Sequence, residues 1–148
     1  MKPEVNEILP GLLGTVITDI APHLPEGYPQ GSMSVIALLM LFSAQEFDRA
    51  AEVRSHENQA MRALFSDAAR EIPDPDLKRR LQKAANESDE SLKVSALNAS
   101  NCLLKDLMIE LHTATELSDS DWARNTDELI WAMLAEFTAA RKLDLPAF

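Results

Sequence analysis

The sequence has a single cysteine and only four glycines, and each shortage excludes a class of protein. Cys102 alone makes no disulfide within the chain and no cysteine-based metal site. Its neighbours in the sequence are small or apolar, so we expect a buried thiol, and a lone thiol fits a reducing, cytoplasmic setting. The four glycines do not have the spacing of a phosphate-binding loop, so no nucleotide-binding motif is present.

Positive charge is also scarce, with 14 Lys and Arg against 24 Asp and Glu and a formal net charge of −10. Proteins that bind nucleic acid present clustered cations, whereas these are scattered among acids. The same charge disfavours an anionic membrane surface. The most apolar segment, residues 35–42, is much shorter than the roughly 20 residues that span a bilayer. We therefore expect neither a nucleic-acid partner nor a membrane.

What the chain has in abundance is helix-forming residues in helical spacing. Apolar residues recur every three or four positions through residues 34–72 and again through residues 75–117, where the line passes through Ala99, Leu103 and Leu107. Between the two runs, Pro73 ends the first helix, Asp74 is placed to cap the second, and Pro75 suits its first position. The sequence therefore predicts two long helices that fold back on each other.

Shorter helices are expected on either side of this pair. One covers about residues 10–21, where Pro10 is either a first-turn residue or a kink in a longer helix. Residues 22–32 are rich in proline and glycine and predict a loop, with Ser32 or Ser34 as the cap of the long helix that follows. The last helix starts at residues 118–121, where a hydroxyl and acids suit a helix N-terminus.

The predicted fold class is all-α, an antiparallel hairpin of two long helices with two flanking helices, like a four-helix bundle. Residues 1–148 are expected to form a single domain. The polar run at residues 86–89 either continues the second long helix or breaks it, and the sequence leaves both open. Because the central helices are long for so small a domain, part of their apolar surface stays uncovered, and we expect a homodimer.

Two polar residues, Arg54 and Asn58, interrupt the apolar stripe of the first long helix, where Met, Phe and Ala would otherwise continue. A polar residue in such a seam fixes register and partner choice. Equal rise of both helices from Pro73 places Asp89 and Glu90 nearest, so we predict a buried or half-buried Arg54–Glu90 pair; a rotated stripe would instead leave Arg54 in water. The second helix carries two further polar residues, Asn98 and Asn101, in an otherwise apolar stretch. The candidates for partner binding and specificity are therefore Arg54, Asn58, Glu90, Asn98 and Asn101.

A metal site is the alternative interpretation. Glu52 and His56 share a helix face, and a carboxylate-bridged di-iron bundle resembles this arrangement, but that site needs Glu-x-x-His on two helices, which this sequence lacks. The expected register also places no acid opposite residues 52–56. We expect no metal and no cofactor. The alternative, a ferritin-like oxidoreductase, would draw its ligands from Glu46, Glu52, His56, Glu110 and His112.

In size, acidity and paired long helices, residues 34–117 resemble the small helical chaperones that escort flagellar filament-junction proteins. The resemblance is one of pattern, and the additional helix after Ser118 departs from it. It implies a non-enzymatic adaptor or chaperone-like protein that acts through helix-to-helix contacts. Exposed apolar residues such as Leu38, Leu39, Phe42 and Trp131 would then receive a partner helix.

Overall fold

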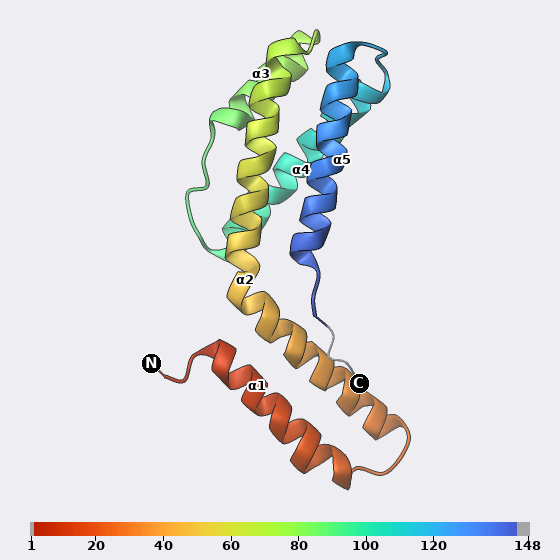
Figure 1. The fold of residues 1–148 in the computed structure, drawn as a ribbon. Helices are drawn as coiled ribbons and strands as arrows, with labels where there is room; N and C mark the ends of the chain where they lie inside the picture. Colours follow the sequence, from red (N-terminus) through yellow and green to blue (C-terminus); the bar gives the residue numbers. More distant parts are fainter. Residues whose placement is uncertain (1, 145–148) are drawn as a thin grey trace. The chain divides into compact units, whose positions relative to one another are not determined.

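The structure is a computed structural model that describes residues 2–144, and these residues are helical with no strand among them. The all-α prediction is confirmed. No helix in this part of the chain has the length and apolar content to cross a membrane. In chain order the elements are α1 (Val5–Thr15), a π-helical turn (Val16–Ile20), a 3-10 turn (Ala21–His23), α2 (Tyr28–Glu71), α3 (Pro75–Asn86), α4 (Val94–Glu116) and α5 (Asp121–Arg141) (Figure 1).

The chain divides into two compact units, which are described separately. The described part of unit 1 is residues 2–50 and 143–144, and unit 2 is residues 51–142. The long helix α2 contributes its first part to unit 1 and its second part to unit 2. The expectation of a single domain stays a prediction.

Helix α2 begins earlier than the sequence predicts, at Tyr28 instead of residues 32–34. Pro29 falls in its first turn, where the missing N–H would have no partner in the helix, so proline is compatible with that position. The loop before it shrinks to a few residues and turns at Gly27, whose φ of 101° lies in the left-handed region that glycine adopts readily. Pro10 lies inside α1, so the longer of the two predicted N-terminal helices is the one that forms.

The second long helix of the predicted hairpin is two helices, α3 and α4, because the chain leaves helical conformation at residues 87–93. The start of α3 is as predicted: the Asp74 side chain accepts hydrogen bonds from the backbone N–H groups of Asp76 and Leu77. The non-helical linker lets the chain reverse, so α3 runs antiparallel to the second part of α2 and α4 runs parallel to it (Figure 1). Helix α5 returns antiparallel to α4.

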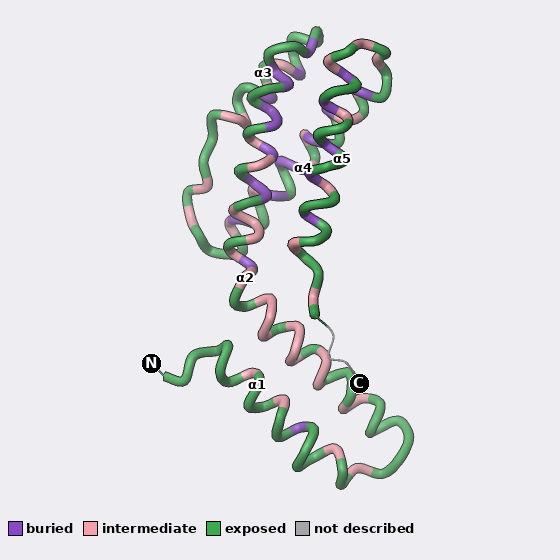
Figure 2. Tube along the Cα trace, viewed as in Figure 1, coloured by how far each residue is buried: buried purple, intermediate pink, exposed green. Residues whose placement is uncertain are grey.

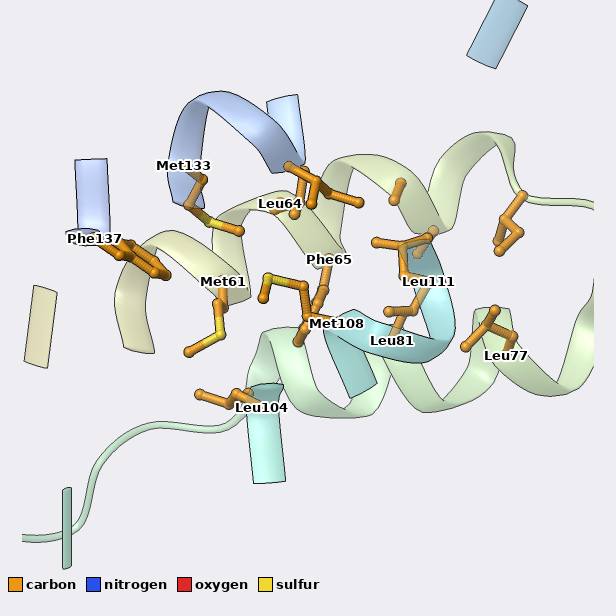
Figure 3. Packing of buried hydrophobic residues seen from close by; sticks show 14 residues of the cluster. Met61, Leu64, Phe65, Leu77, Leu81, Leu104, Met108, Leu111, Met133 and Phe137 are labelled. Atoms are coloured by element: carbon orange, nitrogen blue, oxygen red, sulfur yellow. The ribbon is translucent and has the colours of Figure 1, made fainter. Parts of the chain in front are cut away.

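Unit 2 is organised around one apolar core, to which the second part of α2, α3, α4 and α5 all contribute. Met61 and Phe65 of α2 and Leu81 of α3 are fully buried there, and Met108 and Leu111 of α4 face them (Figure 3). Figure 2 shows the buried positions concentrated in these four segments. Burial at about 25 cal/mol per Å² of apolar surface makes this core the main stabilising term of unit 2.

The buried line of α4 is rotated by about one position from the line that the sequence predicts. The prediction runs through Ala99, Leu103 and Leu107, whereas Leu103 is 71% exposed. The observed line on α4 alternates steps of four and three: Leu97, Asn101, Leu104, Met108, Leu111 and Thr115. The predicted line was carried across residues 86–93 as though the helix were continuous, and the break resets its phase.

Unit 1 pairs α1 and the turns after it with the first part of α2. Of its described residues, only Val16 and Ala50 are buried hydrophobic residues. The two helices run antiparallel, and an apolar groove of about 410 Å³ separates their facing side chains. It is lined by Leu13, Val16, Ile17, Ala21, Met33, Ser34, Ala37, Leu38 and Leu41. Unit 1 therefore has much less interior than unit 2.

We predict that Leu81→Ala lowers the free energy of unfolding by about 2–5 kcal/mol. The Leu81 side chain has no exposed surface, so removing it leaves a cavity in the core. The matched control is Leu103→Ala, a deletion of the same atoms at an exposed site, which should cost no more than about 0.5 kcal/mol. Urea-induced unfolding followed by circular dichroism measures both. Equal losses for the two variants would contradict the assignment of the core.

Candidate functional site

Three of the buried polar residues of unit 2 form a cluster, on the same helical lines as its apolar core. Glu57 and Asn58 of α2 have no exposed surface, and Asn101 of α4 is 2% exposed. Glu57 precedes Met61 by four positions, and Asn101 lies between two buried leucines of α4. Their burial requires partners, since an unpaired buried carboxylate or amide costs more than folding can readily offset.

The carboxylate of Glu57 joins three helices. Arg141, the last residue of α5, donates from Nε to Oε1 at 2.5 Å and from Nη2 to Oε2 at 2.9 Å. From α4, Asn101 donates to Oε2 at 2.9 Å and the Lys105 ammonium to the same oxygen at 3.2 Å. A bidentate arginine together with a second cation is the strong form of carboxylate pairing. The group therefore acts as a clamp between α2, α4 and α5.

The electrostatic consequence is a carboxylate that stays ionised in the interior. Burial on its own raises the pKa of Glu57. Hydrogen bonds from Arg141, Asn101 and Lys105 outweigh that effect and lower the pKa from 4.5 to about 2. Both oxygens already accept hydrogen bonds from the protein, so the arrangement favours a structural role over acid–base chemistry at neutral pH.

The same cluster extends to the linker between α3 and α4 through Asn58. Its Oδ1 accepts from Asn101 at 2.9 Å, and its Nδ2 donates to the carboxylate of Asp89 at 3.1 and 3.2 Å and to the carbonyl of Leu97 at 3.2 Å. Arg62 pairs with the same carboxylate at 2.9 and 3.2 Å. Hydrogen bonds from Arg62, and then from Asn58, lower the pKa of Asp89 below its ordinary value. The cluster thereby fixes where the linker crosses α2.

The five residues that the sequence singled out for partner choice fall in different places. Asn58 and Asn101 are inside unit 2, where the contacts they make set the register of helices within one chain. Arg54 is half-buried, and its Nε donates to Asn98 of α4 at 3.4 Å. Glu90 is exposed. Arg62 and Asp89 form an ion pair near the predicted level, and the Arg54–Glu90 pair stays a prediction.

The candidate metal ligands do not converge among the described residues, where no group of three His, Cys, Asp or Glu side chains is placed to hold a metal ion. His56 lies 3.2 Å from Glu136, and Glu110 pairs with Arg80 of α3. Nε2 of His112 is 2.9 Å from Asp127 of α5, and its ring meets Trp131 edge-on. Glu52 is exposed and Glu46 half-buried. The ferritin-like alternative thus gains no ligand set from these residues.

Cys102 is exposed, so the prediction of a buried thiol is wrong. Its position follows from the rotated line of α4, which places residue 101 inward and residue 102 outward. The nearest polar contact of its sulfur is the side-chain amide of Asn98, at 3.9 Å.

Sequence reasoning missed the cations that complete the cluster, Arg62, Lys105 and Arg141. A signal was present for Arg141, because it follows Phe137 by four positions and so continues the buried line of α5. Glu57 shows the same signal on α2, because it precedes the buried Met61 by four positions and so extends the buried line of that helix. A cation and an acid that each extend an apolar line are candidates for an ion pair at the edge of the core.

Comparison with known proteins identifies no relative: no family model, no curated protein and no solved structure matches this chain. Function therefore has to be argued from its own residues.

Glu57 should make stability depend on pH in a defined window. Its pKa is about 2 in the folded protein against 4.5 as the ordinary value, so the unfolded state binds the proton first and stability falls as pH drops from about 4.5 to about 2. Over that window the loss due to Glu57 approaches about 3 kcal/mol. Glu57→Gln should be less stable than wild type at pH 7, and the gap should close toward pH 2. Urea unfolding at a series of pH values tests this, and a constant gap would contradict it.

The hydrogen bonds of the Asn101 amide can be tested against Asn98, an exposed asparagine on the same helix, as the control. Asn101→Ala removes the donor to Oδ1 of Asn58 and one of three donors to Oε2 of Glu57 in the interior, so we expect a loss of about 1–3 kcal/mol in unfolding free energy. Asn98→Ala, at an exposed site, should lose less than about 0.5 kcal/mol. The measurement is thermal or urea unfolding of both variants at neutral pH. A smaller effect at residue 101 than at residue 98 would be the contrary result.

Proposed function

We propose that this protein is a non-enzymatic helical interaction protein, an adaptor or chaperone-like molecule of the cytoplasm, that binds another polypeptide through helix-to-helix contacts. Unit 1 is the binding element, and unit 2 is the folded support that carries it. Two contrasts between the units support this division.

The first contrast is in burial. Unit 2 encloses its apolar side chains in one core, and its buried polar groups find partners in the clamp around Glu57. Most of unit 1 is exposed or half-buried (Figure 2). Its exposed residues include large apolar ones in α1, in the π-helical turn and in the first part of α2: Val5, Ile8, Leu12, Ile17, Ile20, Tyr28, Val35, Ile36, Leu39 and Phe47. So many exposed apolar side chains in one small unit favour an interaction surface, whereas isolated ones are ordinary.

The second contrast is in the first part of α2, the observation that carries the proposal. On the side toward α1, the side chains of Met33, Leu38 and Leu41 line the groove. Its opposite side carries Val35 and Leu39, exposed by 55% and 59%. A helix that is apolar around its whole circumference is normally buried on every side. Helix α1 covers one side, so a partner helix is expected on the other.

Photo-crosslinking from Leu39 tests this function in the full chain. Benzoylphenylalanine at residue 39 should form discrete covalent adducts in cells, because the side chain lies against a bound polypeptide. The matched control is the same probe at Leu103, an isolated exposed apolar residue of unit 2. Adducts from residue 39 that disappear with Val35→Glu support the proposal. Equal or absent labelling at the two sites would refute it.

A further inference from the structure

On the side of α2 that faces away from α1, the residues follow the spacing of a helix–helix interface. Tyr28, Ser32, Val35, Leu39 and Phe42 follow one another in steps of four, three, four and three. This spacing is that of a two-helix seam, in which side chains of one helix interlock with those of a second helix. These five residues, the outer stripe, do not line the groove toward α1.

We infer that the outer stripe binds the outer stripe of a second copy of this chain, in antiparallel orientation. The inference rests on the proposed function and names its partner. Two observations support a second copy as the partner, and a third sets the orientation.

The first observation is the absence of charge. Residues 27–45 contain no Asp, Glu, Lys or Arg, so the stripe offers nothing by which a basic or acidic partner would be selected. A segment that is itself uncharged and apolar is the complementary surface, and the chain supplies that segment in a second copy. A two-fold interface of this kind uses the same patch on both subunits.

The second observation is area. In the outer stripe, Tyr28, Val35 and Leu39 are 88%, 55% and 59% exposed. These three side chains present apolar surface on the order of 300–400 Å², the size of the patches that mark interaction sites on monomers. A second stripe laid against them would cover that surface.

The third observation is the position of the acids that follow the stripe, and it decides the orientation. A parallel pair would place Glu46, the next seam position, against its own copy. An antiparallel pair that sets Val35 opposite Leu39 of the second copy sets Tyr28 opposite Glu46, where a phenolic O–H can donate to a carboxylate. It also sets Ser32 opposite Phe42. The antiparallel register thus avoids like charges and matches large side chains with small ones.

Light scattering of the purified full chain measures the mass. We expect twice the 16.4 kDa of one chain for wild type and for Leu103→Glu. Leu39→Glu, which buries a charge in the seam, should give the single-chain mass with unchanged helix content by circular dichroism. Leu39→Glu that remains a dimer would overturn the inference.

Disulfide crosslinking tests the orientation in a Cys102→Ser background. Val35→Cys and Leu39→Cys chains, oxidised as a mixture, should form a mixed disulfide, whereas each alone should form little. Two cysteines at the same position would be offset by four residues, about 6 Å along helix axes that are themselves about 8–10 Å apart, so their Cα atoms would lie beyond the roughly 7 Å that a disulfide spans. Efficient crosslinking of each variant alone would indicate a parallel pair and overturn the inference.

The outcome also separates the two proposals. Wild type at single-chain mass, with residue 39 photo-crosslinked to a different protein, refutes the second copy and leaves the interaction function standing. Single-chain mass with no adduct from residue 39 refutes both.

Discussion

The ionised carboxylate of Glu57 imposes the strictest requirement on this structure. A charge with no exposed surface has to be met by cations and hydrogen-bond donors at fixed positions. Those donors come from Arg141 at the end of α5 and from Asn101 and Lys105 on α4. These hydrogen bonds fix the positions of α2, α4 and α5 relative to one another around Glu57. The contact between Asn58 and Asp89 fixes the position of the linker in the same way. The apolar core supplies most of the stability, while the clamp selects one arrangement of helices with similar apolar faces.

The two units differ in how completely they bury their apolar side chains and provide partners for their polar ones. In unit 2 the apolar groups have a common interior, and Glu57, Asn58 and Asn101 have partners. In unit 1 a pair of antiparallel helices encloses little, and the first part of α2 stays apolar on the side away from α1. Two helices alone bury too little surface to be stable in most proteins. An added helix from outside would complete unit 1, which is why we assign the interaction to it.

The sequence predicts the helical class and the helix boundaries that depend on local chemistry, such as the Pro73–Asp74–Pro75 transition, because capping and proline geometry act within a few residues. The break at residues 87–93 was left open, since the polar run at residues 86–89 fits either a continuous helix or a break. The phase of α4 was predicted wrongly for that reason. The burial of Cys102 was also predicted wrongly, because small and apolar neighbours in the sequence do not show which side of the helix a residue occupies. The clamp depends on residues 84 positions apart, Glu57 and Arg141. Each shows only as one polar residue in an apolar line, which does not identify its partner.

A double-mutant cycle between Glu57 and Arg141 tests the central claim most directly. The unfolding free energies of wild type, Glu57→Gln, Arg141→Met and the double variant give the coupling between the two side chains. If the clamp holds α5 to α2, the double variant loses less than the two single losses added together, with a coupling on the order of 2 kcal/mol at pH 7. Losses that add within experimental error would show that the two residues act independently, and would contradict the account.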